Sequence, residues 1–175
     1  MKIDYLKIYN KSHNNAVDLL RESKILFEHE CYARSYALAY TALEEISKSQ
    51  LAADVFTRFS EEEEFLEKYI NHKDKIKRIN WAHNDANSFP YNEIWTGPDK
   101  EDIEKVSPKE PLWDKRQKAL YVDIDKRNQD VFVPETNIRK EDAQDIIHIV
   151  DVALQRIWEM TEHWGHQIGT KGFMK

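Results

Sequence analysis

Glycine and proline are scarce in this sequence. Its 175 residues contain 4 Gly and 5 Pro, and none of them stands before Pro90. A β-sandwich or β-barrel needs a turn about every 8–12 residues, usually with Gly, Pro, Asn or Asp. Phosphate-binding loops need glycines at fixed spacing, and neither the P-loop nor the dinucleotide pattern occurs here. All-β, Rossmann and P-loop folds are therefore excluded.

Cysteine is also scarce, since Cys31 is the only one. A single Cys excludes an intramolecular disulfide framework and fits a reducing compartment. The first residues have no apolar core of the kind that a signal peptide carries. No run approaches the ~18 consecutive apolar residues that a membrane span needs. We therefore expect a cytoplasmic protein without a membrane partner.

Positive charge does not dominate either. Lys and Arg number 26 against 32 Asp and Glu, which gives a formal net charge of −6 at pH 7. Such a chain has no general attraction for nucleic acid, so an RNA contact would need a local basic patch. The length fits one domain, and a hydrophobic content of 41% argues against disorder. We expect a single domain over residues 1–175 with a mobile tail at 166–175.

Apolar residues recur at helical spacing along most of the chain. The pattern predicts helices over residues 4–29, 31–57, 61–83, 112–119 and 139–164. Residues 121–133 are expected to be extended or turn-like, and the Pro- and Asn-rich segment 84–111 to be an ordered insert or lid. The second helix is apolar or small around most of its circumference, so it should be central. The sequence thus predicts an all-α, up-and-down helical bundle with an irregular insert around 84–111.

Glu45 stands on an apolar side of the second helix, together with Leu38, Ala42 and Ala52. A carboxylate in such surroundings is costly unless it is paired. Its candidate partners are Lys48, His72, Lys73 and Arg116. The pairing would place Glu45 either in an ion pair that orients two helices or in a binding or catalytic site, and both interpretations stay open.

Four short segments follow one another as similar segments do in the AbiV abortive infection family. Residues 43–48 read Leu-Glu-Glu-Ile-Ser-Lys and resemble its Leu-Glu-Glu-Ile-Gly-Lys signature. Residues 71–75 resemble its His-Lys-x-Lys element, and residues 116–123 resemble its Arg-x-x-x-Leu-Tyr-Val-Asp element. Residues 134–143 resemble the lead into its last helix. The small and aromatic residues that precede the first segment are also similar to those of HEPN domains, a superfamily of small helical bundles.

This resemblance implies a bacterial antiphage protein with a HEPN-like bundle that forms a homodimer. It also implies interference with phage gene expression. Many HEPN proteins are metal-independent RNases, in which an Arg and a nearby His act on the RNA backbone. A His base suits this reaction because its pKa lies near neutrality, and an Arg stabilises charge that develops on phosphate. At the corresponding place this chain has Arg116 and then Tyr121, and a Tyr with its usual pKa of about 10 is a poor base.

The RNase hypothesis therefore assigns the role of base or acid to His72. Arg116 and Lys73 would contact the phosphate, and Glu45 and Lys48 would orient the other groups. The residues proposed for catalysis are His72, Arg116, Glu45 and Tyr121, and those proposed for binding are Lys48, Lys73, Glu44, Lys75 and Asp123. The alternatives are a non-catalytic sensor that binds a phage protein and the toxin of a toxin–antitoxin pair.

Other patterns are less specific. Two further Arg–His pairs, Arg78 with His83 and Arg156 with His163, have a similar spacing but lie elsewhere in the chain. The basic residues between 73 and 78 fit either an RNA-facing patch or the C-terminal end of a helix, where the macrodipole favours cations. No His or Cys group has the spacing of a three- or four-ligand metal site. We therefore expect no metal and no cofactor.

Overall fold

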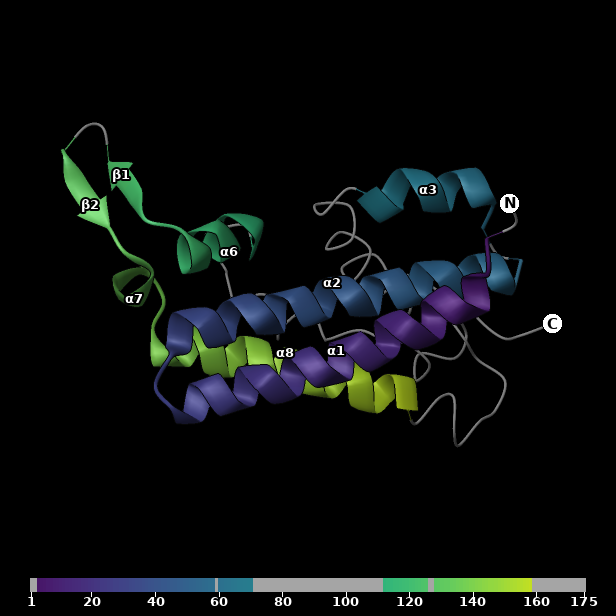
Figure 1. Cartoon of the computed structure of the whole chain (residues 1–175), viewed down its shortest axis with the longest axis horizontal. Helices are drawn as coiled ribbons and strands as arrows, with labels where there is room; N and C mark the ends of the chain where they lie inside the picture. The colour runs from purple at the N-terminus through teal and green to yellow at the C-terminus, as the bar shows by residue number, and fades with distance from the viewer. Residues whose placement is uncertain (1–2, 59, 71–111, 126–127, 159–175) are drawn as a thin grey trace, which may run out of the picture.

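The computed structural model describes residues 3–58, 60–70, 112–125 and 128–158 (Figure 1). Within these ranges the chain forms the helices α1 (Tyr5–Glu28), α2 (Tyr32–Phe56), α3 (Glu62–Ile70), α6 (Leu112–Leu120), α7 (Pro134–Asn137) and α8 (Lys140–Trp158). The strands β1 (Asp123–Asp125) and β2 (Asp130–Phe132) form an antiparallel two-stranded sheet. The predicted all-α bundle is therefore confirmed.

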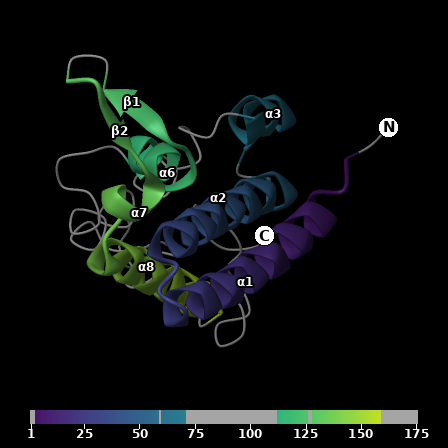
Figure 2. The ribbon, with the colours of Figure 1, turned by 60° about the vertical axis from the view of Figure 1, so that its left-hand side comes forward.

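Helix α2 lies at the centre of the bundle. Helices α1 and α2 run antiparallel, α8 packs on both of them, and α3 and α6 lie along the opposite side of α2 (Figures 1 and 2). Of the 25 residues of α2, 18 are buried. The prediction of a central second helix is confirmed. Because the chain itself covers the apolar circumference of α2, that circumference is not evidence for a second subunit.

Two helices end without glycine. The N–H of Cys31 donates to the carbonyl of Leu26 at 2.9 Å across the end of α1, and Glu30 between them has φ 60°. Arg58 has φ 65° just after α2. Left-handed residues at this position close helices, and Gly usually supplies them because a Cβ is strained there. Because no Gly occurs before residue 90, the strained non-glycine residues Glu30 and Arg58 end these two helices.

The core has two clusters of buried side chains. The larger one joins α1, α2, α6 and α8, and Tyr36 and Tyr40 are among its largest members. The smaller one joins the start of α1, the end of α2 and α3 around Phe65. Between α1 and α2, the hydroxyls of Ser23 and Ser35 each donate to the carbonyl of the other residue, at 2.8 and 2.9 Å. This reciprocal pair satisfies both buried hydroxyls where the two helices approach closely.

Several predicted elements are confirmed, two helices were predicted to extend past the described residues, and one short helix was not predicted. The helices expected over 4–29, 31–57 and 112–119 correspond to α1, α2 and α6. The helix expected over 61–83 is described as α3 up to Ile70, and the one expected over 139–164 is described as α8 up to Trp158. Residues 121–133 contain a strand hairpin, and α7 was not predicted. The segments 84–111 and 166–175 lie outside the described residues.

Candidate functional site

One face of α2 carries two tyrosines and a glutamate in line. Tyr36, Tyr40 and Glu44 are spaced four residues apart, so they lie one above another along the helix. Tyr36 and Tyr40 are fully buried, and Glu44 is 3% exposed. This face meets α6, which packs on α2. A buried carboxylate at the end of an aromatic row needs positive charge nearby.

Two adjacent cations of α6 lie over the aromatic rings of this row. The Lys115 ammonium lies over the Tyr36 ring at 5.8 Å from its centroid, and the Arg116 guanidinium lies over the Tyr40 ring at 5.5 Å. Both distances are within the range of cation–π attraction, which contributes about 0.5–2 kcal/mol per pair depending on desolvation. We call Tyr36, Tyr40, Glu44, Lys115 and Arg116 the α2–α6 cluster. It fastens α6 to α2.

Asp142 connects this cluster to α8. Its carboxylate lies 2.6 Å from the Lys115 ammonium and accepts a hydrogen bond of 2.8 Å from the backbone N–H of Arg139. Arg139 immediately precedes α8, so Asp142 caps the helix that it belongs to. The side chains of Lys115 and Asp142 are only 13% and 22% exposed. The ion pair is therefore shielded from solvent and holds three helices together.

Tyr40 contributes its ring to the cluster more than its hydroxyl. Its buried hydroxyl has no hydrogen-bond partner in the part of the chain that the structure describes. Burial raises the pKa of the Tyr40 hydroxyl well above its usual value, and the Glu44 and Asp114 carboxylates raise it further, while Arg116 opposes them. Tyr40 is therefore neutral at physiological pH. It supports Arg116 and does not act as a base.

Glu45 and Lys48 form a separate pair on another side of α2. The Lys48 ammonium donates to the Glu45 carboxylate one helical turn earlier, and it also lies 5.6 Å from the centroid of the Tyr69 ring on α3. The two side chains are 12% and 20% exposed. Of the partners considered for Glu45, Lys48 is therefore the one that the described residues provide, and the pair faces α3.

Tyr121 and Asp123 lie in a third place. With Asp114, Gln117, Lys118 and Val122 they line an open hollow of about 400 Å³ on the outer side of α6. Tyr121 is 61% exposed. Five residues of helix correspond to about 140° around the axis, so Arg116 and Tyr121 point to different sides. The Arg34 guanidinium donates to the carbonyl of Leu120 at 3.2 Å and caps this end of α6.

The predicted site residues thus divide into three places within the described chain. Arg116 and Glu44 belong to the α2–α6 cluster, Glu45 and Lys48 form the pair beside α3, and Tyr121 and Asp123 line the outer hollow. His72, Lys73 and Lys75 lie outside the described residues. Over the described ranges, no three His, Cys, Asp or Glu side chains are grouped as metal ligands. Among the helices described, none is long and apolar enough to cross a membrane.

Sequence reasoning missed Tyr36, Lys115 and Asp142. A signal existed, because an i, i+4, i+8 row of two tyrosines and a glutamate on an otherwise apolar helix implies a cationic partner. The pair Lys115–Arg116 on a short helix is one such partner. The row alone does not say which cations face it, and the chain contains 26 Lys and Arg residues. The structure identifies the pair.

The mostly helical bundle built around the buried helix α2 is consistent with an all-α, HEPN-like protein. The family model described as AbiV, a HEPN family, matches residues 4–155. The chain belongs to the AbiV family, and is thereby an abortive infection protein of the HEPN superfamily. Neither the curated proteins nor the solved structures give a match.

Proposed function

We propose that this protein protects bacteria from phage by interfering with phage gene expression in the cytoplasm, and that it does so by binding a protein. Membership of the abortive infection family supports the first part. The observation that carries the second part is an exposed apolar surface on the segment that joins α6 to α7. We call α6, β1 and β2 the α6–hairpin arm.

The α6–hairpin arm presents large apolar side chains to solvent. Val122, Ile124 and Val131 are 60–62% exposed, Tyr121 is 61% exposed, and Phe132 is 42% exposed. Single exposed apolar residues are normal on protein surfaces, but contiguous groups mark interaction sites. Figure 1 shows the hairpin projecting beyond the end of the bundle. A partner protein therefore has access to it.

RNA cleavage is the second candidate. The family's Arg position is filled by Arg116, and the hypothesis adds His72 as base or acid, Lys73 on the phosphate, and Glu45 with Lys48 as orienting groups. Against it, the Arg116 guanidinium packs on the buried Tyr40 ring, close to carboxylates. A phosphate that approached this Arg would meet negative charge at Glu44 and Asp114. The binding function is therefore the stronger proposal.

The test is phage protection in bacteria that express matched variants. Ile124→Asp with Val131→Asp places charges on the hairpin, whereas Leu6→Asp with Val17→Asp does the same at two exposed apolar positions of α1. We expect the hairpin variant to lose protection and the α1 variant to keep it, with both proteins folded by circular dichroism. Protection that survives the hairpin substitutions would contradict the proposal.

The RNase candidate has its own readout. Purified protein incubated with RNA in the presence of a metal chelator should leave the RNA intact, and His72→Ala should still protect bacteria. Cleavage that disappears in the His72→Ala variant, together with loss of protection by that variant, would replace binding by catalysis as the function.

We further propose that the protein is a homodimer, on the strength of its family alone. Sedimentation equilibrium at micromolar concentration should give twice the monomer mass of 20.9 kDa. A monomer under these conditions would refute this assignment, and it would leave the binding function in place because the arm is complete within one chain.

A further inference from the structure

We propose that the partner of the arm contributes an extended segment in which Lys or Arg alternates with aliphatic residues, and that this segment adds as a third strand to the outer edge of β2. The inference rests on the proposed binding function and specifies the chemistry of the partner. Three observations lead to it, namely the two faces of the hairpin, the state of its edges, and its charge.

The hairpin has two chemically different faces. Cross-strand neighbours share a face, and successive residues of a strand alternate between faces. The register pairs Ile124 with Val131, and their neighbours are Asp123 paired with Phe132. Ile124 and Val131 therefore form an aliphatic face, at 60% and 62% exposure. The opposite face carries the carboxylates of Asp123 and Asp130 beside the Phe132 ring.

The two edges of the hairpin differ as well. On β1, the backbone N–H of Ile124 donates to the Asp123 carboxylate at 2.8 Å. That N–H is therefore not directed at β2, which identifies Ile124 and Val131 as a non-hydrogen-bonded pair of the ladder. In such a pair the N–H and C=O of both residues point to the outer edges. On the outer edge of β1, the Asp123 side chain accepts the outward N–H. On the outer edge of β2, the N–H and C=O of Val131 point outward, and all three residues of β2 are exposed.

An added strand would extend the two-stranded hairpin to a three-stranded sheet and stabilise it. A two-stranded hairpin is at best marginally stable in water, and a third strand with an apolar face improves it. Recognition by strand addition takes its affinity from main-chain hydrogen bonds and its specificity from alternate side chains. In the added strand, the side chain next to Val131 would be aliphatic, and the side chains next to Asp130 and Phe132 would be of another chemical type.

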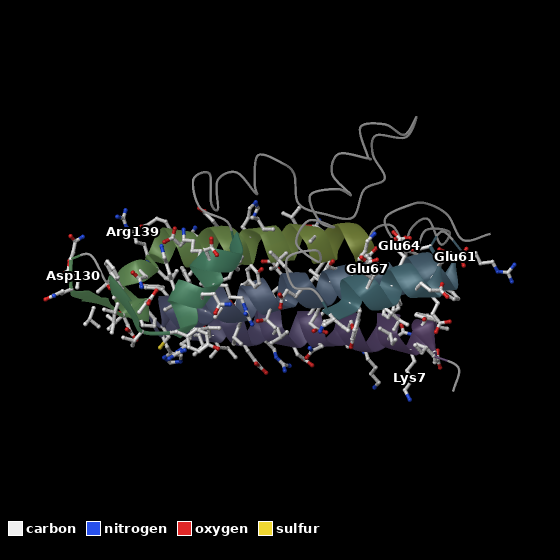
Figure 3. The ribbon with its side chains drawn as sticks, turned by 90° about the horizontal axis from the view of Figure 1, so that it is seen from above. Lys7, Glu61, Glu64, Glu67, Asp130 and Arg139 are labelled. Carbon is white, nitrogen blue, oxygen red and sulfur yellow. The ribbon has the colours of Figure 1, made fainter. Side chains whose placement is uncertain are left out.

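Charge determines what those other side chains are. Asp130 lies on the hairpin at one end of the molecule (Figure 3), and Asp123 shares its face of the hairpin. Lys or Arg next to them would be attracted to both carboxylates and to the Phe132 ring. A second copy of this chain is a poorer occupant, because pairing β2 with β2 would gather four carboxylates from Asp123 and Asp130 on one face.

The experiment titrates the full-length protein with synthetic peptides of eight residues. In the first peptide Lys alternates with Val, in the second Glu replaces Lys, and in the third the same Lys and Val residues stand in two blocks. Amide chemical shifts by NMR locate the contact, and fluorescence anisotropy gives the affinity. We expect the alternating Lys–Val peptide to bind, to shift the Val131 amide, and to bind several-fold more weakly at high salt.

Variants of the hairpin separate its edge from its charge. Val131→Pro removes the outward N–H and should abolish binding, whereas Val131→Thr keeps both the N–H and the preference for a strand and should retain it. Because Val131→Pro can disturb the hairpin itself, Asp130→Asn serves as the second variant. It should weaken the Lys–Val peptide up to about fivefold, as expected for an exposed ion pair, and leave the protein folded.

Equal affinity for the Lys and Glu peptides would overturn the inference, and so would equal affinity for the alternating and block peptides. Peptide contacts that map away from β2 would also overturn it. A dimer that Val131→Pro converts to a monomer would do so too, because a second copy of the chain would then occupy the outer edge of β2. If no peptide binds but phage protection still depends on the hairpin, only this inference is overturned. Protection that depends on RNA cleavage would instead overturn the proposed function.

Discussion

Tyr40 is a phenol whose ring has a structural partner and whose hydroxyl has no hydrogen-bond partner in the described part of the chain. A buried hydroxyl without a hydrogen bond costs free energy, because it has given up water and gained nothing. The ring carries the stabilising part of this residue, since it packs in the core and supports Arg116. Removing the hydroxyl oxygen of Tyr40 therefore tests the effect of the hydroxyl separately from the packing of the ring.

We predict that Tyr40→Phe raises the free energy of unfolding by about 1 kcal/mol, because it removes the uncompensated hydroxyl and keeps the ring. Tyr40→Leu, which loses the cation–π contact and leaves space, should lower the free energy of unfolding by about 1–3 kcal/mol. Urea denaturation followed by circular dichroism measures both. A destabilised Phe variant would mean that the hydroxyl has a role in the folded protein.

Glu30 is the clearest case of strain at a single residue. It has φ 60° and closes α1 in a conformation that Gly adopts without cost. We predict that Glu30→Gly stabilises the protein by about 1 kcal/mol, measured as a shift in the urea midpoint. Glu28→Gly, two residues earlier and inside the last turn of α1, is the matched control and should destabilise it by about 0.5–1 kcal/mol. If both substitutions destabilise, the strain at Glu30 is not what limits stability.

At the scale of elements, α6 is too short to be stable alone. Isolated helices of fewer than about 12 residues are marginal in water, and α6 has nine. Part of its attachment comes from Ala119, which is buried in the larger core cluster. The polar part consists of the two cation–aromatic contacts with α2, the hydrogen bond from Arg34 to Leu120 and the Lys115–Asp142 ion pair with α8. The orientation of the whole α6–hairpin arm therefore depends on a small number of contacts.

We predict that Asp142→Ala lowers the free energy of unfolding by about 2 kcal/mol, because it removes a helix cap and leaves the shielded Lys115 without this partner. Asp151→Ala provides the comparison. Asp151 also lies on α8 and pairs with Lys24 of α1 at 2.6 Å, but the two side chains are 47% and 44% exposed. The expected loss there is under about 1 kcal/mol. Hydrogen exchange should show faster opening of α6 only in the Asp142 variant, and equal effects in both variants would contradict this account.

The long helices could be predicted from the sequence because their periodicity is repeated over several turns. In α2 the apolar positions recur often enough to place both ends within a residue or so of Tyr32 and Phe56. The hairpin offered no such repetition. β1 and β2 have three residues each, and a period of two cannot be distinguished over so short a length. Helix α7 is one turn that starts at Pro134, where the sequence indicated only a break.

The candidate site was predictable in its residues and less so in its geometry. Glu44 and Arg116 were selected as members of different motifs, and the Glu45–Lys48 pair follows from helical spacing alone. The contact of Arg116 with Tyr40 joins positions far apart in the chain. Nothing in a single sequence states which face of a short helix turns inward. By contrast, helical periodicity alone explains why Arg116 and Tyr121, neighbours in one motif, point to different sides.

At the scale of the whole molecule, net charge favours the proposed protein binding over RNA cleavage. The net charge is −6, and carboxylates lie at both ends of the molecule. Glu61, Glu64 and Glu67 lie on or beside α3, and Asp130 lies on the hairpin (Figure 3). A surface of this kind repels RNA and attracts a basic protein segment. The long-range field thus supports the partner chemistry inferred for the edge of β2.

We predict that the protein does not retard a short single-stranded RNA in gel-shift assays at micromolar concentration and about 0.15 M salt, because binding of nucleic acid requires phosphate neutralisation by clustered cations. The variant with Asp123→Lys and Asp130→Lys is the control. It changes the charge of the hairpin at two positions outside the α2–α6 cluster, and it should gain salt-sensitive RNA binding while losing the Lys–Val peptide. RNA binding by the unmodified protein that weakens steeply with salt would show that a local basic surface outweighs the net charge, and would make RNA the target.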